Sequence, residues 1–451
     1  MTIRVTSGGR AVARSGLLPT SANELLGFLT GNSSSLLALA TQCAESDADD
    51  CNDFAFAIIY AVYGSSEYFC ESPRRFLPYQ LLTGALTGPQ ARVNSIVPQR
   101  HPSDALNAAI LATRWISGTE MRSLESALDI RSGVLTGLFA DAANIIRGLA
   151  DVIYAVTTTQ PTEELPASVD PSTLQALSQL IAPIRRIASR LDKGLPDDVV
   201  WMWSIVGSST ALLTRPQILK LRNAGFLSPE QILDPGKFPQ LIHAFGAPSA
   251  ATSQSAQDLQ GAVRSWRSAE RARLIDSQRR RLPEECRDLL TRFYRAREKE
   301  FEDAVEEIFI CFDIAVDAKD DGSVSSFPDF VTAALPPQNL ALECKSKTVG
   351  EAVTFNDATD VIRKAGVNGY KDSFKVTICQ PYISPDVPRK LASCDDLSVV
   401  NAEDFAEAFV RLKIGKITKQ DLADWLTTPG QALKENLSSN TANTMILPEG
   451  S

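Results

Sequence analysis

The spacing of apolar residues changes once along this chain, near residue 310, and that change limits the folds open to it. Before it, apolar residues recur at helical spacing, as in 54–63 and 132–157. After it, short β-branched and apolar runs alternate with helical runs at 355–365, 403–413 and 419–428. We therefore predict an all-α N-terminal half and a C-terminal α/β domain, whose mixed central sheet is flanked by helices. The expected strand runs are 309–318, 324–335, 339–347, 373–383 and 397–402.

Prolines, turn residues and shifts in composition divide the chain further. Pro283 interrupts the long helical stretch 259–309. The predicted parts are a short leading segment at 1–20 (a strand, a turn and a small-residue helix), a helical domain at 21–155, a second helical domain at 173–245, a mobile small-residue linker at 246–258, a basic helical connector at 259–299, the α/β domain at 300–428 and a disordered tail at 429–451.

Composition excludes several classes of protein. The 451 residues are 44% hydrophobic, which is enough for packed cores, yet no apolar run has the length of a membrane span. No secretion signal opens the sequence, and none of its eight cysteines forms a CxxC pair, so we expect a cytoplasmic protein with reduced thiols and no membrane partner. Only two histidines are present, which argues against a zinc enzyme built on histidine.

Charge is distributed unevenly. The net charge is −9, but residues 261–299 carry twelve Lys and Arg against six Asp and Glu. Residues 301–451 carry fourteen basic against twenty-four acidic side chains. A basic segment that meets phosphate beside an acidic domain that holds metal is typical of a nuclease.

The basic segment has two interpretations. Its arginines, among them Arg279, Arg280 and Arg281, could follow a phosphate backbone, and Trp266, Phe293 and Tyr294 could stack on unpaired bases. Alternatively, the segment is a solvated amphipathic helix whose charges pair at i, i+4.

Five residues between 300 and 347 form the clearest chemical pattern. Glu302 lies on a helical stretch, Asp329 on a strand or turn, and Glu343 and Lys345 are two residues apart on a strand. Side chains at i and i+2 of a strand share one face, so Cys344 points to the opposite face. An Asp at the end of one strand of a hairpin could therefore lie beside Glu343 on the next.

These residue types suit phosphodiester hydrolysis. Asp329 and Glu343 offer carboxylates to Mg²⁺ or Mn²⁺, and the Cys344 carbonyl offers another oxygen. Lys345 can orient the attacking water or stabilise developing charge. Either Glu302 or Glu306 could complete the metal site through water. The alternative is that Glu343 and Lys345 form only an exposed ion pair, which would contribute little.

This arrangement resembles the PD-(D/E)xK nuclease superfamily, the restriction-endonuclease-like fold. The matching residues are Pro328-Asp329 and Glu343-Cys344-Lys345, with the helix at 355–365 and the strand at 374–380 after them. The resemblance covers about 295–427 and implies Mg²⁺-dependent cleavage of DNA, with a place in antiviral or foreign-DNA defence. The chain departs from the pattern in the loop between the two ligand strands, which carries two prolines.

The N-terminal half resembles the rear half of superfamily-2 helicases of the superkiller type. Residues 4–19 are similar to the end of the winged-helix domain, and the helices at 54–63 and 103–150, with Trp115, are similar to the ratchet domain. The segment 211–233 is similar to a helix–hairpin–helix, a module that holds nucleic-acid backbone through its turn. The resemblance implies nucleic-acid contacts from this segment, with charge added by Arg215, Lys220 and Arg222. An ordinary helical hairpin explains the segment equally well.

No phosphate-binding loop GxxxxGK[ST] occurs in the sequence, so we expect the chain to contain no ATPase motor. If the helicase resemblance holds, the motor is a separate helicase or ATPase subunit. Two other functions remain open: a non-catalytic DNA-binding adaptor of a helicase complex, and a structural scaffold with no role in nucleic-acid binding.

Overall fold

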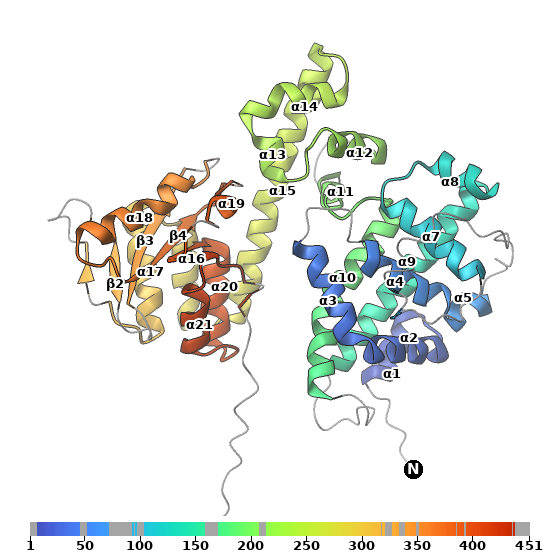
Figure 1. The fold of residues 1–451 in the computed structure, drawn as a ribbon, viewed down its shortest axis with the longest axis horizontal. Helices are drawn as coiled ribbons and strands as arrows, with labels where there is room; N and C mark the ends of the chain where they lie inside the picture. Colours follow the sequence, from blue (N-terminus) through green and yellow to red (C-terminus); the bar gives the residue numbers. More distant parts are fainter. Residues whose placement is uncertain are drawn as a thin grey trace, which may run out of the picture. The chain divides into compact units, whose positions relative to one another are not determined.

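The structure is a computed structural model, and the chain separates into two compact units, Met1–Trp266 and Arg267–Ser451 (Figure 1). The residues that it describes are 7–45, 52–71, 93, 95–96, 103–157, 170–206, 213–316, 318–320, 327–332, 339–348, 351–384, 386–391, 394–434 and 436–437. Within these ranges, no helix has both the length and the apolar character needed to cross a membrane.

The first unit is helical throughout its described residues. Its elements are α1 (Ser7–Ser15), α2 (Pro19–Gly31), α3 (Ser33–Glu45), α4 (Asn52–Tyr63), α5 (Ser66–Glu71), α7 (Ser103–Ile116), α8 (Met121–Leu128), α9 (Ser132–Thr157), α10 (Pro171–Lys193), α11 (Met202–Val206), α12 (Arg215–Asn223), α13 (Pro229–Leu233), the 3-10 helix η2 (Pro235–Lys237), α14 (Phe238–Phe245) and the first part of α15 (Ala250–Arg281).

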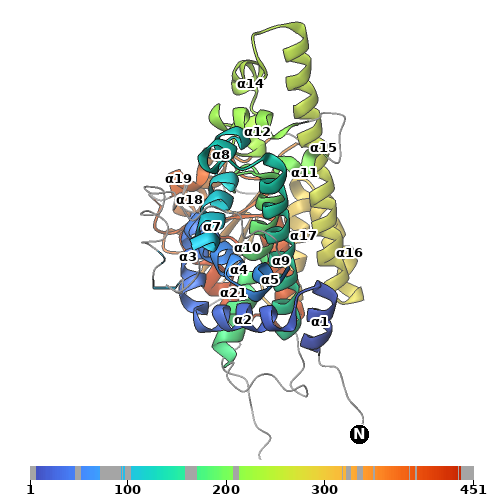
Figure 2. The same ribbon diagram turned by 90° about the vertical axis from the view of Figure 1, so that its right-hand side faces the viewer.

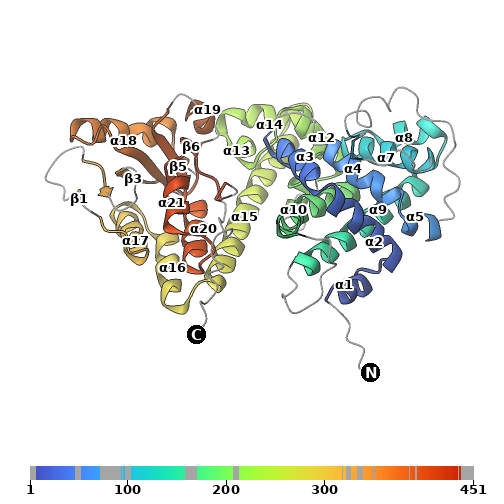
Figure 3. The same ribbon diagram turned by 60° about the horizontal axis from the view of Figure 1, so that its bottom comes forward.

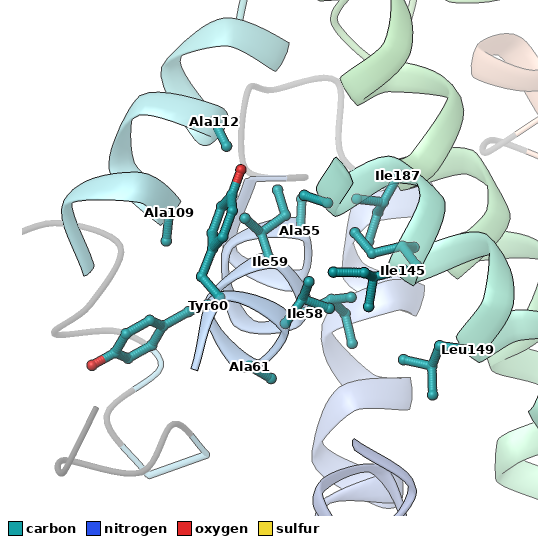
Figure 4. Packing of buried hydrophobic residues seen from close by; sticks show 14 of the residues in the cluster. Ala55, Ile58, Ile59, Tyr60, Ala61, Ala109, Ala112, Ile145, Leu149 and Ile187 are labelled. Atoms are coloured by element: carbon teal, nitrogen blue, oxygen red, sulfur yellow. The ribbon is translucent and has the colours of Figure 1, made fainter. Parts of the chain in front are cut away.

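Helix α4 forms the centre of the first unit. Every residue from Asp53 to Tyr63 is buried, because the helix is apolar almost all round and neighbours cover all its sides. Figure 4 shows Ile58 packed near Ile145 of α9 and Ile187 of α10. Burial of each such side chain contributes roughly 1.5–3 kcal/mol. This core confirms the expectation that 54–63 is a buried helix.

The described part of the segment 211–233, residues 213–233, folds as a short helical hairpin. Gly225 ends its turn at φ 83°, a backbone conformation that glycine adopts without strain. Ser228 caps α13 by accepting a hydrogen bond from the Gln231 N–H, and Pro229 stands at the first helical position. Helix α12 starts with a capping box between Thr214 and Gln217. The expected helix–turn–helix geometry is therefore present.

A contact at Gly194 ties this hairpin to the larger helical core. Gly194 has φ 63° and ends α10, and its carbonyl accepts a 2.7 Å hydrogen bond from Arg215 Nε. The Arg215 guanidinium lies over the Trp115 ring, 3.8 Å from its centre. A Cβ atom on residue 194 would overlap the Trp115 ring. Only glycine fits both the backbone conformation and the space.

The second unit contains the described strands. Its elements are the rest of α15, the 3-10 helix η3 (Glu284–Cys286), α16 (Arg287–Arg295), α17 (Glu298–Cys311), β1 (Ala318–Lys319), β2 (Phe330–Thr332), β3 (Leu340–Ser346), α18 (Phe355–Val367), β4 (Phe374–Gln380), α19 (Val387–Leu391), β5 (Leu397–Asn401), α20 (Ala402–Lys413), α21 (Lys419–Leu426) and β6 (Gly430–Gln431).

The strands form one mixed sheet in the order β1-β2-β3-β4-β5-β6, antiparallel from β1 to β3 and parallel from β3 to β6. One apolar core joins its first face to α16, α17, α20 and α21, and a smaller core joins the other face to α18 and α19 (Figure 3). The prediction of a mixed sheet flanked by helices is therefore confirmed.

Several segments differ from their sequence-based predictions. Most of the expected linker 246–258 is the start of α15, because Ser249 and Thr252 cap the helix by bonding each other's backbone N–H groups. The apolar residues near Phe309 end α17 and do not begin a strand. Gly430–Gln431, in the expected disordered tail, pairs with β5. The strand expected at the start of 1–20 lies outside the described residues.

Replacing Gly194 by Ala tests the contact with Trp115. We expect Gly194→Ala to lower the free energy of unfolding of the first unit by about 3 kcal/mol or more, through left-handed strain and overlap. The matched variant Gly225→Ala has φ 83° but no atom within 4 Å of the added methyl group, so we expect a loss of about 1–2 kcal/mol. Urea unfolding followed by tryptophan fluorescence measures both. Equal losses would contradict the packing described.

Candidate active site at strand β3

The register of β2 on β3 brings two acidic residues together. Phe330 pairs with Leu342 in this antiparallel ladder, so the preceding Asp329 lies opposite Glu343. The Asp329 carbonyl accepts a hydrogen bond of 3.1 Å from the Asp320 N–H, which continues the β1–β2 pairing. Asp329 thus stands directly before β2 and beside Glu343, in the hairpin arrangement expected from the sequence.

A hydrogen bond fixes the Asp329 carboxylate to the neighbouring strand. Asp329 Oδ2 accepts a 2.6 Å hydrogen bond from the Cys344 N–H. In a strand, the N–H and C=O of one residue point to the same neighbour, so the Cys344 carbonyl is directed toward the Asp329 side as well. The Cys344 side chain lies in the core shared with α17 and α20. Three oxygen-bearing groups therefore converge at this point.

Glu343 and Lys345 share the face of the sheet that α18 covers, and Cys344 points to the opposite face, as predicted. Lys345 Nζ donates to Glu343 Oε1 at 2.6 Å and to Asp360 Oδ2 of α18 at 3.2 Å. Only 2% of the Glu343 side chain is exposed, against 22% for Lys345. The pair is therefore not the solvated surface ion pair that was the alternative.

Lys364 is a site residue that the sequence analysis missed. Its Nζ donates to Glu343 Oε1 at 2.6 Å and lies 3.6 Å from Asp329 Oδ1, so it bridges the two carboxylates. Lys364 and Asp360 are four residues apart on α18, next to the apolar stripe that faces the sheet. That spacing, in the helix directly after the Glu343 strand, was the available signal.

Burial and charge together alter proton binding at the site. Burial, and then the charge of Glu343, raise the pKa of Asp329 to about 7, although the Cys344 N–H and Lys364 oppose the shift. Burial lowers the pKa of Lys345, but the charge and hydrogen bond of Glu343, with the hydrogen bond to Asp360, outweigh it and raise that pKa. Lys345 is therefore an ammonium at neutral pH.

The donor set suits a hard divalent cation. Glu343 Oε2 is buried and has no hydrogen-bond partner among the described residues, which would be costly without a cation or water. No group of three His, Cys, Asp or Glu side chains in the described ranges is arranged around a metal. Two carboxylates and a main-chain carbonyl match Mg²⁺, which keeps several waters and phosphate oxygens as further ligands.

Glu302 lies apart from this group. It is on α17, which packs on the other face of the sheet, and its ion pair is with Lys299 at 3.4 Å. Its charge still contributes to the raised pKa of Asp329. The structure thus brings together Asp329, Glu343 and Lys345. Glu302 can act on the site through its negative charge or through a water molecule.

Trp115 and Arg215, which the helicase resemblance implied as nucleic-acid contacts, have protein partners within the first unit. Trp115 stacks on Phe139 with ring centres 5.5 Å apart, and its Nε1 donates to the Leu191 carbonyl at 2.8 Å. Arg215 donates to main-chain carbonyls, including that of Thr119 at 2.9 Å, and burial lowers its pKa to about 10. Both residues hold the helices of the first unit together.

The charged residues near the hairpin and on α15 divide into paired and exposed groups. Arg222 Nε is hydrogen-bonded to both carboxylate oxygens of Asp198, at 3.0 and 2.8 Å, whereas Lys220 is exposed. Arg281 forms a bidentate pair with Glu407 at 2.8 and 3.0 Å, and Arg280 pairs with Asp276. Arg279 is exposed.

The aromatic residues expected to stack on bases are mostly in the interior. Phe293 and Tyr294 are in the main core of the second unit, with Tyr294 Oη donating to Gln278 at 2.6 Å. Trp266 packs on Trp201, with ring centres 5.3 Å apart. Phe293 and Tyr294 follow Leu289 and Leu290 by four residues each, so all four lie on the buried face of α16.

Comparison of the chain with models of protein families, with curated proteins and with solved structures found no match. The chemistry of the second unit is therefore inferred from the geometry of its site.

The raised pKa of Asp329 makes the stability of the second unit depend on pH. Between about pH 4 and pH 7, folded Asp329 keeps a proton that the unfolded chain releases, so stability falls as the pH rises through this range. From pH 6 to pH 8 we expect the free energy of unfolding to fall by on the order of 1 kcal/mol from this group.

Urea unfolding at both pH values is followed by tryptophan fluorescence, and the signal of the second unit is the part that Trp425→Phe removes, because the other four tryptophans belong to the first unit. Asp329→Asn should remove this part of the pH dependence, whereas the exposed control Asp424→Asn should keep it. An unchanged pH dependence in Asp329→Asn would contradict the assignment.

Proposed function

We propose that the second unit is a metal-dependent deoxyribonuclease of the restriction-endonuclease-like fold. The observation that carries the proposal is that Asp329 lies opposite Glu343, with Lys345 on the same face of the sheet as Glu343. Glu343 Oε2 is buried and has no protein partner among the described residues. The order of antiparallel and then parallel strands, with helices on both faces, supports the fold. Phosphodiester hydrolysis is the chemistry that this set suits best.

Asp329, Glu343 and the Cys344 carbonyl would hold Mg²⁺ or Mn²⁺. When bound, such an ion neutralises phosphate charge and lowers the pKa of its water. The hydrogen bond from the Cys344 N–H fixes the Asp329 carboxylate before substrate arrives. Glu302, through its field or a water molecule, adds negative charge that favours a cation.

Lys345 acts as a donor in this proposal. An ammonium has three N–H bonds and cannot accept a proton, so Lys345 cannot be the general base at neutral pH. Two of its donors reach Glu343 Oε1 and Asp360 Oδ2. The third can orient the attacking water or a phosphate oxygen, where developing negative charge is stabilised.

DNA is the proposed substrate, with the exposed arginines of α15 available for its phosphates. Arg279 is exposed, and Arg280 has a surface ion pair that phosphate can replace at little cost. In this proposal a separate helicase or ATPase subunit supplies the motor, and the complex acts in defence against foreign DNA. Co-purification of the chain with a motor subunit, and no ATP turnover by the chain alone, are the expected outcomes.

One observation favours the non-catalytic adaptor as a second candidate. Lys364 Nζ donates to Glu343 and lies 3.6 Å from Asp329, so an ammonium group offsets part of their charge without a metal. In this candidate the domain has lost catalysis, and Lys364 stabilises the two carboxylates in place of a metal. Such a domain would bind DNA or a motor subunit without cleaving DNA. The two candidates differ in whether the site binds metal and cuts.

Replacing Lys345 tests catalysis directly. We expect Lys345→Ala to lower the rate of plasmid cleavage with Mg²⁺ by about 100-fold or more, because charge stabilisation of this kind contributes several kcal/mol. DNA binding in chelator should change little. The matched control is Lys347→Ala. Lys347 follows the same strand directly and pairs with Asp357 at 2.9 Å, and its removal should leave full activity. Failure of the parent protein to cleave supercoiled, linear and single-stranded DNA would favour the adaptor.

Metal binding can be measured without activity. We expect the parent protein to bind Mn²⁺ in a calorimetric titration, and Glu343→Gln to bind it at least about tenfold more weakly, since it loses a ligand charge. Glu307→Gln is the control, because Glu307 lies on α17, pairs with Arg292 at 2.6 Å and is outside the proposed set. Equal Mn²⁺ affinity in the parent and in Glu343→Gln would contradict the assignment of Glu343 as a ligand.

A further inference from the structure

A basic groove on the first unit is independent of the proposed active site. It lies where α1 packs against α9, with α10 on the other side of α9 (Figure 2). The hollow has a volume of about 650 Å³. Its lining residues are Arg10, Ala11, Arg14, Asp151, Tyr154, Ala155 and Arg185.

Helical spacing places these side chains on one surface. Arg10 and Arg14 are four residues apart on α1, and Asp151 and Tyr154 are three apart on α9. Arg185 of α10 pairs with Asp151 at 2.8 Å, an exposed pair with 51% and 60% of the side chains accessible. Among the described residues, three guanidinium groups thus line the groove against one carboxylate.

The position of α1 is set by a close approach to α9. A Cβ atom on Gly148 would come within 3.0 Å of the Ser15 Cβ and 3.1 Å of the Leu17 Cγ. The glycine therefore lets the end of α1 lie directly on α9. This contact fixes the distance between the two arginines of α1 and Tyr154.

Charge and exposure point to an anionic ligand with a flat ring. Arg10 and Arg14 present two guanidinium groups on one face of α1, at the border of the groove. Guanidinium forks match the geometry of phosphate oxygens. Tyr154 is 54% exposed although it is a large aromatic residue, and its ring borders the same groove. An exposed aromatic ring among arginines is the arrangement that binds unpaired bases and their phosphates.

We propose that this groove binds single-stranded nucleic acid, with Arg10, Arg14 and Arg185 on phosphates and Tyr154 stacked on a base. Only the shared chemistry of a phosphate chain with unpaired bases is assigned, so DNA and RNA are both tested. The proposal does not depend on cleavage in the second unit.

The test is fluorescence anisotropy of the full chain with labelled 20-nucleotide DNA and RNA, at several salt concentrations and in chelator. Arg10→Gln with Arg14→Gln should weaken binding about tenfold at low salt. The slope of log K against log salt should become shallower by about 1.4, since each contact with a single strand contributes about 0.7. The control pair Arg122→Gln with Arg131→Gln removes two exposed arginines of the same unit and should leave the slope unchanged.

Tyr154 provides a second, independent measurement. Tyr154→Ala should weaken binding roughly 5- to 150-fold, whereas Tyr154→Phe, which keeps the ring, should retain affinity. Circular dichroism melting confirms that each variant is folded. The proposal is overturned if the double arginine variant binds as tightly as the parent, or if the control pair shows the same loss. It is also overturned if polyglutamate displaces the labelled strand as well as unlabelled oligonucleotide does.

Discussion

The register between β2 and β3 is the constraint on which the second unit's site depends. Side chains alternate between the faces of a sheet, so a slip of one residue would turn Asp329 away from Glu343. Burial prevents that slip: Phe330 and Leu342 are 1% exposed and lie in the core shared with α17 and α20. The apolar residues of the two strands therefore fix the positions of the polar ones.

The site also shows how buried carboxylates are tolerated. Glu343 is almost fully buried, and an isolated charge in that position would be strongly unfavourable. Lys345 and Lys364 both donate to its Oε1, and Asp329 accepts a main-chain N–H from the next residue of β3. Each lysine has a second carboxylate beside it, Asp360 for Lys345 and Asp329 for Lys364, so the charges of the group are paired more than once. Stability and proposed chemistry thus rest on the same side chains.

Local pattern was sufficient to predict much of this arrangement. The period of two in 339–347 placed Glu343 and Lys345 on one face, and the helical run at 355–365 was correctly predicted as the crossover to the next strand. The proximity of Asp329 followed from a hairpin. Lys364 was not found, because its contact with Glu343 joins a helix to a strand, and its spacing of four from Asp360 on α18 was the one local signal for it.

Other differences have the same origin in tertiary contacts. The composition of 246–258 resembles a linker, but its Ala and Gln residues are good helix formers, and Ser249 and Thr252 cap the first turn. Arg215 and Trp115 belong to residue types that often bind nucleic acid. Here the arginine lies on the indole and donates to carbonyls of other segments, which no sequence period reveals. The restriction-endonuclease-like assignment remains a proposal that the Lys345 and Mn²⁺ experiments test.

The short length of β2 shows what holds Asp329 in place. β2 has three residues and β1 two, whereas β3 and β4 have seven each. The ladder bonds of so short a strand are few, and the packing of the Phe330 side chain and the hydrogen bond from the Cys344 N–H to the Asp329 carboxylate supply the remaining contacts. The acidic pair therefore depends on the side chains that flank β2 more than on the backbone pairing of β2 itself.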